Sequence, residues 1–292
     1  DGGNGYGYLS PSRTVVDKDG NCWVANRSFW LGPASVTQIL GSGGVDFNAN
    51  SVINTSNDAN ANGVIDPWEI LPWGQDERVV RHYNLGSPTG DQARGMTIDK
   101  MGFLWVGLCT TNQLVKVSTT LPIATYGSNM PSSYPPVLAT IPIPGLMPYG
   151  LAVSPNGLIY MSTLSDRAYQ VDPGLASGGT GAGPAITEYI NHGGCNYGLT
   201  VDKNCVVWLA MIWSPGPGGY GCVRWDPPLT AGNPLNGWTY SNAGAPAQGR
   251  GIGIDFNNDV WMACNDGANS AVKFSNTPVP NVLGVYPTPS PV

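Results

Sequence analysis

The hydrophobic and polar positions of this chain repeat in five stretches of one pattern. Each stretch is a short apolar segment, a polar turn of four residues and a second apolar segment with an aromatic residue near its start. Asp or Ser begins every turn and Gly or Asn ends most of them, which is typical of tight hairpins. The stretches align without gaps, so the pattern predicts five β-hairpins. They begin at Arg13, Gly95, Gly150, Gly198 and Gly251.

The aromatic residue holds one position in all five hairpins, at Trp23, Trp105, Tyr160, Trp208 and Trp261. Two further segments with alternating apolar and polar residues follow each hairpin, which is typical of half-buried strands. Third strands are predicted over residues 36–39, 115–118, 169–172, 223–226 and 272–275. Fourth strands are predicted over residues 79–83, 137–141, 186–190, 238–240 and 282–286. Four antiparallel strands in a repeat of roughly 50 residues form one blade of a β-propeller.

The repeats therefore predict an all-β fold, a β-propeller of five four-stranded blades with a loop insertion in the first blade. The predicted domain spans residues 1–286, with blades approximately over residues 11–86, 92–145, 147–193, 195–244 and 248–286. A β-sandwich or an open array of sheets is the competing interpretation, but a sandwich gives no reason to repeat one hairpin five times. Residues 287–292 are rich in proline and predict a tail or a stiff linker. Whether the chain is a piece of a larger protein therefore stays open.

The motif Gly-φ-φ-Val-Asp-x-x-Gly-x-φ-Trp-Val, in which φ is apolar, resembles the repeats of NHL-type propellers and of streptogramin B lyase-like propellers. The resemblance runs from about Arg13 to Tyr286. It implies the propeller fold but says little about activity, because one fold hosts many functions. Members of these families usually have six or seven blades. Five repeats therefore imply either a ring of five blades or a piece of something larger.

Composition narrows the classes of function. Charged residues make up 11% of the chain, against about 25% in a typical soluble domain, and hydrophobic residues make up 41%, enough to fill a core. The net charge is −6 without a cluster of Lys or Arg, so the basic surface that nucleic acids require is missing. No apolar run approaches the roughly 20 residues of a membrane helix. Low charge and abundant Gly, Asn and Pro indicate a secreted or cell-surface protein.

The six cysteines form no CxxC pair and have no histidine at zinc spacing, so metal–thiolate chemistry is not indicated. Their even number in a Lys-poor chain predicts an oxidising compartment and at least one disulfide. The predicted pair is Cys195 and Cys222. Six buried free thiols are the alternative. The cysteines are Cys22, Cys109, Cys195, Cys205, Cys222 and Cys264.

A long insertion between the third and fourth strands of the first repeat carries the most specific chemical motif. Residues 58–69 fit the calcium-loop pattern D-x-[DN]-x-[DN]-G-x5-E at every specified position. Ca²⁺ takes six to eight oxygen ligands, and ligands on alternate residues of a loop wrap around one point. No paired helices flank the motif, which predicts a structural ion, and a solvated Asn/Gly turn is the alternative. The predicted ligands are Asp58, Asn60, Asn62, the carbonyl of Val64, Asp66 and Glu69.

A second candidate site is the mouth of the propeller channel, where the first strand of each blade begins. The residues that enter these strands are Ser12, Arg94, Tyr149, Tyr197 and Arg250. Arg forks and Tyr rings hold anionic or carbohydrate ligands through hydrogen bonds and stacking. The alternative is that Arg94, Tyr149, Tyr197 and Arg250 only fill the channel mouth.

Catalysis is less well supported by the residues. The lyase resemblance implies histidines and a glutamate around a magnesium ion at the channel face, but the only histidines, His82 and His192, fall in or after fourth strands, where a solvated role is expected. The sequence also lacks a GxSxG nucleophile elbow. We therefore expect a non-catalytic surface module that binds a glycan, a protein or its own copy. A lyase-like or lactonase-like propeller enzyme is the alternative.

Overall fold

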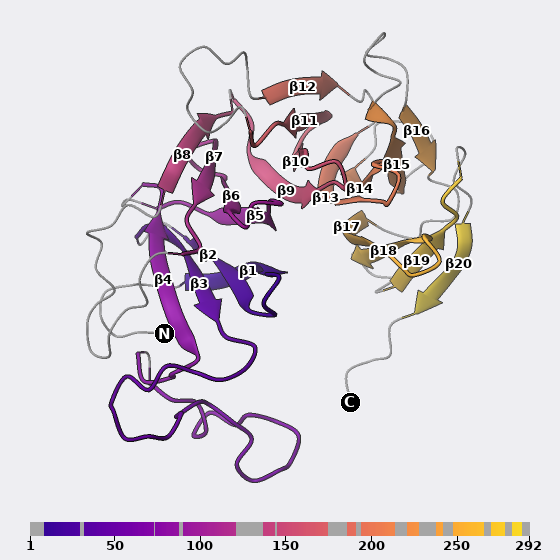
Figure 1. Cartoon of the computed structure of the whole chain (residues 1–292). Helices are drawn as coiled ribbons and strands as arrows, with labels where there is room; N and C mark the ends of the chain where they lie inside the picture. Colours follow the sequence, from indigo (N-terminus) through magenta and orange to yellow (C-terminus); the bar gives the residue numbers. More distant parts are fainter. Residues whose placement is uncertain are drawn as a thin grey trace. The chain divides into compact units, whose positions relative to one another are not determined.

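The computed structural model describes residues 9–29, 32–72, 74–87, 90–120, 137–143, 145–174, 186–190, 194–213, 221–227, 238–241, 248–265, 270–277 and 282–287. Within these ranges the chain forms five antiparallel sheets of four strands each (Figure 1). The chain divides into two compact units, residues 1–140 and 141–292. No helix among the described residues is long and apolar enough to cross a membrane.

The first unit contains the first two sheets, apart from the last residues of β8. Strands follow the chain in order across each sheet. The first sheet consists of β1 (Leu9–Val16), β2 (Cys22–Ser28), β3 (Ala34–Ile39) and β4 (Val79–Leu85). The second consists of β5 (Ala93–Ile98), β6 (Leu104–Leu108), β7 (Gln113–Val117) and β8 (Val137–Pro142).

The second unit contains the other three sheets, again with the strands in chain order. The third sheet consists of β9 (Pro148–Val153), β10 (Ile159–Thr163), β11 (Arg167–Val171) and β12 (Ile186–Ile190). The fourth consists of β13 (Cys195–Val201), β14 (Val207–Trp213), β15 (Cys222–Trp225) and β16 (Trp238–Ser241). The fifth consists of β17 (Gln248–Ile254), β18 (Val260–Asn265), β19 (Ser270–Phe274) and β20 (Val282–Pro287). The predicted four-stranded repeat is confirmed, whereas closure into a ring of five blades stays a prediction.

One aspartate organises four of the five hairpins of the repeat. In the second repeat, Asp99 Oδ1 accepts the backbone N–H groups of Met101 and Phe103 at 2.9 and 3.0 Å. Its other oxygen, Oδ2, accepts the indole N–H of Trp105 at 2.8 Å. The same carboxylate therefore closes the turn and orients the aromatic side chain. The equivalent indole bonds run to Asp17, Asp202 and Asp255 at 3.2, 3.4 and 2.9 Å.

The last turn residue has a positive φ in all five hairpins, which explains the preference for glycine and asparagine at this place. The angles are 81° at Gly20, 86° at Gly102, 92° at Gly157, 65° at Cys205 and 66° at Asn258. Cys205 occupies the left-handed region without the stereochemical freedom of glycine or the local hydrogen bonding of asparagine.

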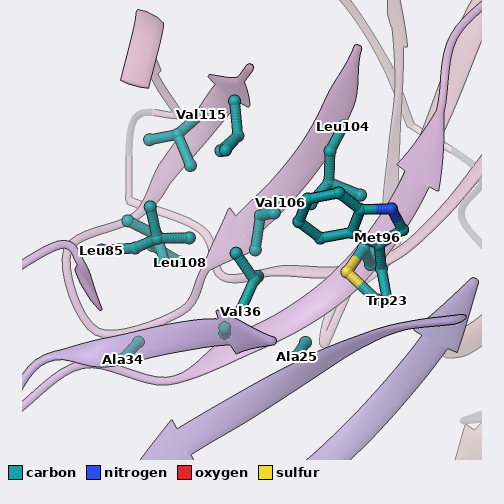
Figure 2. Close-up of a cluster of buried hydrophobic side chains, with 12 residues drawn as sticks. Trp23, Ala25, Ala34, Val36, Leu85, Met96, Leu104, Val106, Leu108 and Val115 are labelled. Carbon is teal, nitrogen blue, oxygen red and sulfur yellow. The ribbon is translucent and has the colours of Figure 1, made fainter. Parts of the chain in front are cut away.

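Each core lies between consecutive sheets of one unit. In the first unit Trp23 and Val36 pack with Leu104, Val106 and other residues of the second sheet (Figure 2). In the second unit β14 turns alternate residues to its two neighbours: Leu209 packs in a cluster with Tyr160 of the third sheet, and Trp208 in a cluster with Phe274 of the fifth. Because a strand alternates its side chains, one sheet contributes to two cores. A single repeat would leave both faces exposed.

The predicted Cys195–Cys222 disulfide is wrong, because the thiols of Cys195 and Cys222 are not joined in the structure. Cys195 lies on β13, opposite Trp213 of β14. Cys222 lies on β15, opposite Ala210 on the other side of β14. Two strand spacings of about 4.8 Å separate β13 from β15, which exceeds the reach of a disulfide. Cys222 is fully buried, and burial also raises the pKa of the Cys109 thiol to about 12. The alternative of six buried thiols holds only in part, because Cys109, Cys222 and Cys264 are buried whereas Cys22, Cys195 and Cys205 are partly exposed.

The interpretation of His82 as a solvated histidine is also wrong, while His192 lies outside the described residues. His82 is buried, and its Nδ1 lies 2.9 Å from Thr37 Oγ1. Asn26 Nδ2 donates to the same Thr37 oxygen at 3.0 Å, so a polar chain crosses β2, β3 and β4. Burial lowers the pKa of His82 from 6.5 to about 4, and a hydrogen bond with Asn84 only partly opposes this shift.

Burial of His82 predicts a loss of stability in mild acid. The unfolded chain takes up the proton near pH 6.5 and the folded chain only near pH 4, so the stabilisation is complete above pH 6.5 and is lost as pH falls to about 4. The loss should total roughly 3 kcal/mol. Urea unfolding at pH 7.5 and pH 4.5 measures it, and His82→Gln should remove most of this pH dependence. Equal pH dependence in the two proteins would contradict the assignment to His82.

Candidate functional site

Three of the predicted channel-mouth residues form a continuous row in the second unit. Tyr149 on β9 and Tyr197 on β13 meet edge to face, with ring centroids 4.5 Å apart and hydroxyl oxygens 3.2 Å apart. The guanidinium carbon of Arg250, on β17, lies 4.9 Å from the centroid of the Tyr197 ring. Arg250 Nη2 also donates to Gln248 Oε1 at 2.8 Å, a partner that the sequence reading missed. The guanidinium is therefore oriented by a ring and by an amide.

Glycines explain why three separate strands bring these side chains into contact. Each tyrosine of the row is followed by a glycine, Gly150 or Gly198. A Cβ on Gly150 would lie 2.8 Å from the carbonyl oxygen of Tyr197, and a Cβ on Gly198 would collide with the carbonyl oxygen of Arg250. Only a residue without a side chain allows neighbouring first strands to approach this closely. The repeated Gly of the motif thus sets the spacing of the row.

The first unit contains a smaller pair of the same kind. Arg94 is buried at the start of β5, and its Nη1 donates to Ser12 Oγ on β1 at 3.2 Å. Both residues enter first strands, as the sequence predicted. The structure thus brings together Ser12 with Arg94 in one unit, and Tyr149, Tyr197 and Arg250 in the other.

The predicted calcium loop lies, as expected, between β3 and β4. Asp58 accepts the backbone N–H groups of Asn62 and Gly63 at 3.0 and 2.7 Å, and Gly63 has a φ of 85°. Glu69 reaches back across the loop, where its Oε1 accepts the backbone N–H of Asn60 at 3.1 Å and its Oε2 that of Asp66 at 2.8 Å. The two ends of the motif are therefore folded onto its middle.

The donor set of this loop fits Ca²⁺ better than a transition metal. Asn60 and Asn62 both place their side-chain amides within 3.1 Å of Asp66 Oδ2, so three predicted ligands converge. Among the described residues no group of three or more His, Cys, Asp or Glu could hold a metal ion. An ion in this loop would therefore depend on amide and carbonyl oxygens in addition to carboxylates, and hard cations such as Ca²⁺ accept these ligands.

The sequence reading missed a polar residue on each third strand, opposite the aromatic. Lys273 on β19 pairs with Trp261, and its Nζ lies 3.1 Å from Asp255 Oδ2 and 3.0 Å from Asp259 Oδ2. The indole hydrogen bond and this ammonium lower the pKa of Asp255 to about 2. The sequence did contain a sign of these residues, because each apolar third strand includes one long polar side chain. The equivalent residues are Gln38, Lys116, Gln170 and Arg224.

No protein-family profile and no characterised protein sequence matches the chain. Solved structures do. A streptogramin B lyase is 12% identical, with a TM-score of 0.61 over 97% of this chain and 70% of that one. An inactive virginiamycin B lyase from Staphylococcus aureus with quinupristin is 14% identical, with a TM-score of 0.54 over 98% and 86%. A luciferin-regenerating enzyme is 11% identical, with a TM-score of 0.53 over 97% and 78%. These similarities support the β-propeller fold, as the sequence motif implied.

The close approach of the first strands predicts a sharp difference between two Gly→Ala variants. Gly198→Ala places a methyl group against the backbone of Arg250, which no side-chain movement can relieve, and should cost about 1–3 kcal/mol. Gly251→Ala is the matched control at the same motif position, because its methyl group would meet only Ala263 Cβ at 3.7 Å. Thermal unfolding measures both. Equal melting temperatures would show that the glycines do not set the strand spacing.

Proposed function

We propose that this chain is an extracellular, non-catalytic β-propeller of five blades that binds an acidic glycan through the row of Tyr149, Tyr197 and Arg250. The observation that carries the proposal is the contact geometry of this row. Calcium in the insertion between β3 and β4 is proposed to stabilise the fold. The low charge and the Gly-, Asn- and Pro-rich composition support the proposed location outside the cell.

The chemistry of the row favours a ligand with both a carboxylate and ring hydroxyls. Arg250 presents a planar fork of N–H donors, which matches a carboxylate in a bidentate geometry. Because Gln248 and the Tyr197 ring already orient the guanidinium, less side-chain entropy is lost when a ligand binds. The tyrosine hydroxyls add neutral donors and acceptors that suit sugar hydroxyls. The protein as a whole is acidic, so this local positive charge is what selects an anion.

Glycan binding tests the proposal directly. An array of neutral and carboxylated glycans should show selective binding of the carboxylated members, and calorimetry should give the affinity. Arg250→Gln should weaken binding about tenfold or more, because a hydrogen bond to a charged group contributes about 1.5–3 kcal/mol. Arg167→Gln is the control, since Arg167 pairs with Glu188 elsewhere in the second unit. Binding of neutral glycans alone, or equal loss in both variants, would contradict the proposed role of Arg250.

The alternative function is a propeller enzyme of the lyase or lactonase type. The similarity to streptogramin B lyase and virginiamycin B lyase structures favours it. Incubation with quinupristin, followed by chromatography, distinguishes the two functions. Turnover of quinupristin would establish the enzyme class, whereas a glycan ligand without turnover would favour the binding module.

Calcium in the loop of residues 58–69 is the cofactor that we propose. The side chains of Asp58, Asn60, Asn62, Asp66 and Glu69 and the carbonyl of Val64 would supply the ligands. Only three of these groups are carboxylates, which predicts an affinity in the range of extracellular calcium modules. The ion would replace the polar contacts that now link the Asn60 and Asn62 amides to Asp66.

Chelation should therefore destabilise the protein. Ca²⁺ at 100 times its dissociation constant adds about 2.7 kcal/mol to the folded state, so the melting temperature should fall by several degrees in chelator. Mg²⁺ should not restore it, because Mg²⁺ demands a tighter octahedron and dehydrates reluctantly. Glu69→Gln should mimic chelation, and Asp166→Asn, which changes an exposed carboxylate of the second unit, should not. Identical melting curves in calcium and in chelator would leave the loop as a solvated turn.

A further inference from the structure

The calcium motif has a second copy twelve residues earlier in the same insertion. Residues 46–54 read Asp-Phe-Asn-Ala-Asn-Ser-Val-Ile-Asn, and residues 58–66 read Asp-Ala-Asn-Ala-Asn-Gly-Val-Ile-Asp. Six of these nine positions are identical, and they include the first three predicted side-chain ligands. The glutamate expected eleven residues after the first aspartate is missing from the second copy, because Asn57 stands there. The complete motif therefore occurs once in the sequence.

The backbone of the earlier copy folds in the same way. Asp46 Oδ1 and Oδ2 accept the N–H groups of Asn50 and Ser51 at 3.1 and 2.7 Å, as Asp58 does with the residues at the same places. Ser51 has a φ of 66° where the other loop has Gly63 at 85°. Even the alanines between the asparagine ligands agree, with φ values of 57° at residue 49 and 56° at residue 61.

Glu77 takes the place of the missing glutamate from much further along the chain. Its Oε1 accepts the N–H groups of Phe47 and Asn48 at 2.9 and 3.4 Å, and its Oε2 accepts the N–H of Asn54 at 2.7 Å. Glu69 bonds the second, third and ninth residues of its own loop in the same pattern. Two loops with the same hydrogen-bond pattern are therefore closed by glutamates, one next to its loop in the sequence and one much further along the chain.

The charge of Glu77 is a second observation, independent of the shape of the loop. Its side chain is fully buried, whereas most buried carboxylates in proteins are paired with a cation or ligate a metal. Among the described residues no Lys, Arg or His forms an ion pair with Glu77, and the neighbouring Arg78 instead donates to the Gly43 carbonyl at 3.0 Å. The donors that face the carboxylate are backbone N–H groups and the side-chain amide of Asn54, at 3.3 Å from Oε2, and none of them carries a charge, which leaves a place for a cation.

We propose that residues 46–77 hold a second Ca²⁺, bound by Glu77 together with the earlier copy of the motif. Its ligands are the side chains of Asp46, Asn48, Asn50, Asn54 and Glu77 and the carbonyl of Val52. The proposal rests on the calcium role proposed above for residues 58–69, since both loops have the Asp-x-Asn-x-Asn ligands and a glutamate that reaches back to them. It adds a site that closes the base of the insertion, because backbone bonds from Val45 to Glu77 and from Glu77 to Asn54 already join its two ends.

Counting bound Ca²⁺ tests this proposal on the intact chain. Equilibrium dialysis against Ca²⁺ at a fixed free concentration should give two ions per chain for the unchanged protein. Glu69→Gln and Asp46→Asn should each leave one ion, and the double variant none. Asn50→Ala repeats the test of the earlier loop with an exposed side chain, in case the change at Asp46 disturbs folding. Asp166→Asn, the control, should keep two ions.

The outcomes separate the two sites. One ion in the unchanged protein that Glu69→Gln removes, and that Asp46→Asn and Asn50→Ala leave in place, would overturn the second site and leave the first. One ion that Asp46→Asn and Asn50→Ala abolish, and Glu69→Gln does not, would uphold the second site and overturn the first. A chain that binds no Ca²⁺ in dialysis would overturn both.

Discussion

The fold depends on one carboxylate in four of its five hairpins, which accepts backbone N–H groups with one oxygen and an indole N–H with the other. In the second repeat Asp99 fixes the turn that precedes β6 and holds the buried Trp105 at the start of that strand. Because the turn and the aromatic share one residue, the register of the hairpin and the direction of the largest side chain cannot change independently. The third repeat replaces the pair with Ser154 and Tyr160, and Ser154 Oγ donates to the Leu158 carbonyl at 2.8 Å to hold the turn.

This constraint passes from the hairpins to the candidate ligand site. Fixed registers place a glycine of one first strand against the backbone of the next, as Gly198 lies against Arg250. The residue before each glycine then meets its counterpart on the neighbouring strand, which is how Tyr149, Tyr197 and Arg250 form a row. The row therefore results from the packing of equivalent sheets. The side chains that it offers to a ligand depend on which residue precedes the glycine in each repeat.

The sequence predicted what is local and periodic. Turn residues and the alternation of apolar and polar positions lie within short windows, and the structure places strands at each expected segment. Prediction from the sequence failed where a residue contacts partners that lie far away along the chain. His82 lies in an outer strand by position, yet Thr37 and the surrounding core bury it. Cys195 and Cys222 lie near in the repeat but on opposite sides of β14. Glu77 bonds the loop of residues 46–54 although residues 58–69 lie between them in the sequence, so a motif with fixed spacing does not include it.

In both the insertion and the hairpins, carboxylates accept backbone N–H groups. They differ in whether an indole or an ammonium group also contacts the carboxylate, and this difference distinguishes structural carboxylates from candidate metal ligands. Asp99 is satisfied by the Trp105 indole, and Asp255 has both an indole and the Lys273 ammonium. Glu77 has neither, although it is the most deeply buried of these three carboxylates. Burying a charge without a counter-ion costs free energy, which hydrogen bonds offset in part and a bound cation would offset further. The fifth repeat thus carries its own cation as a lysine side chain, whereas no lysine or arginine among the described residues pairs with Glu77, and this difference is what motivates the proposed Ca²⁺ in the insertion.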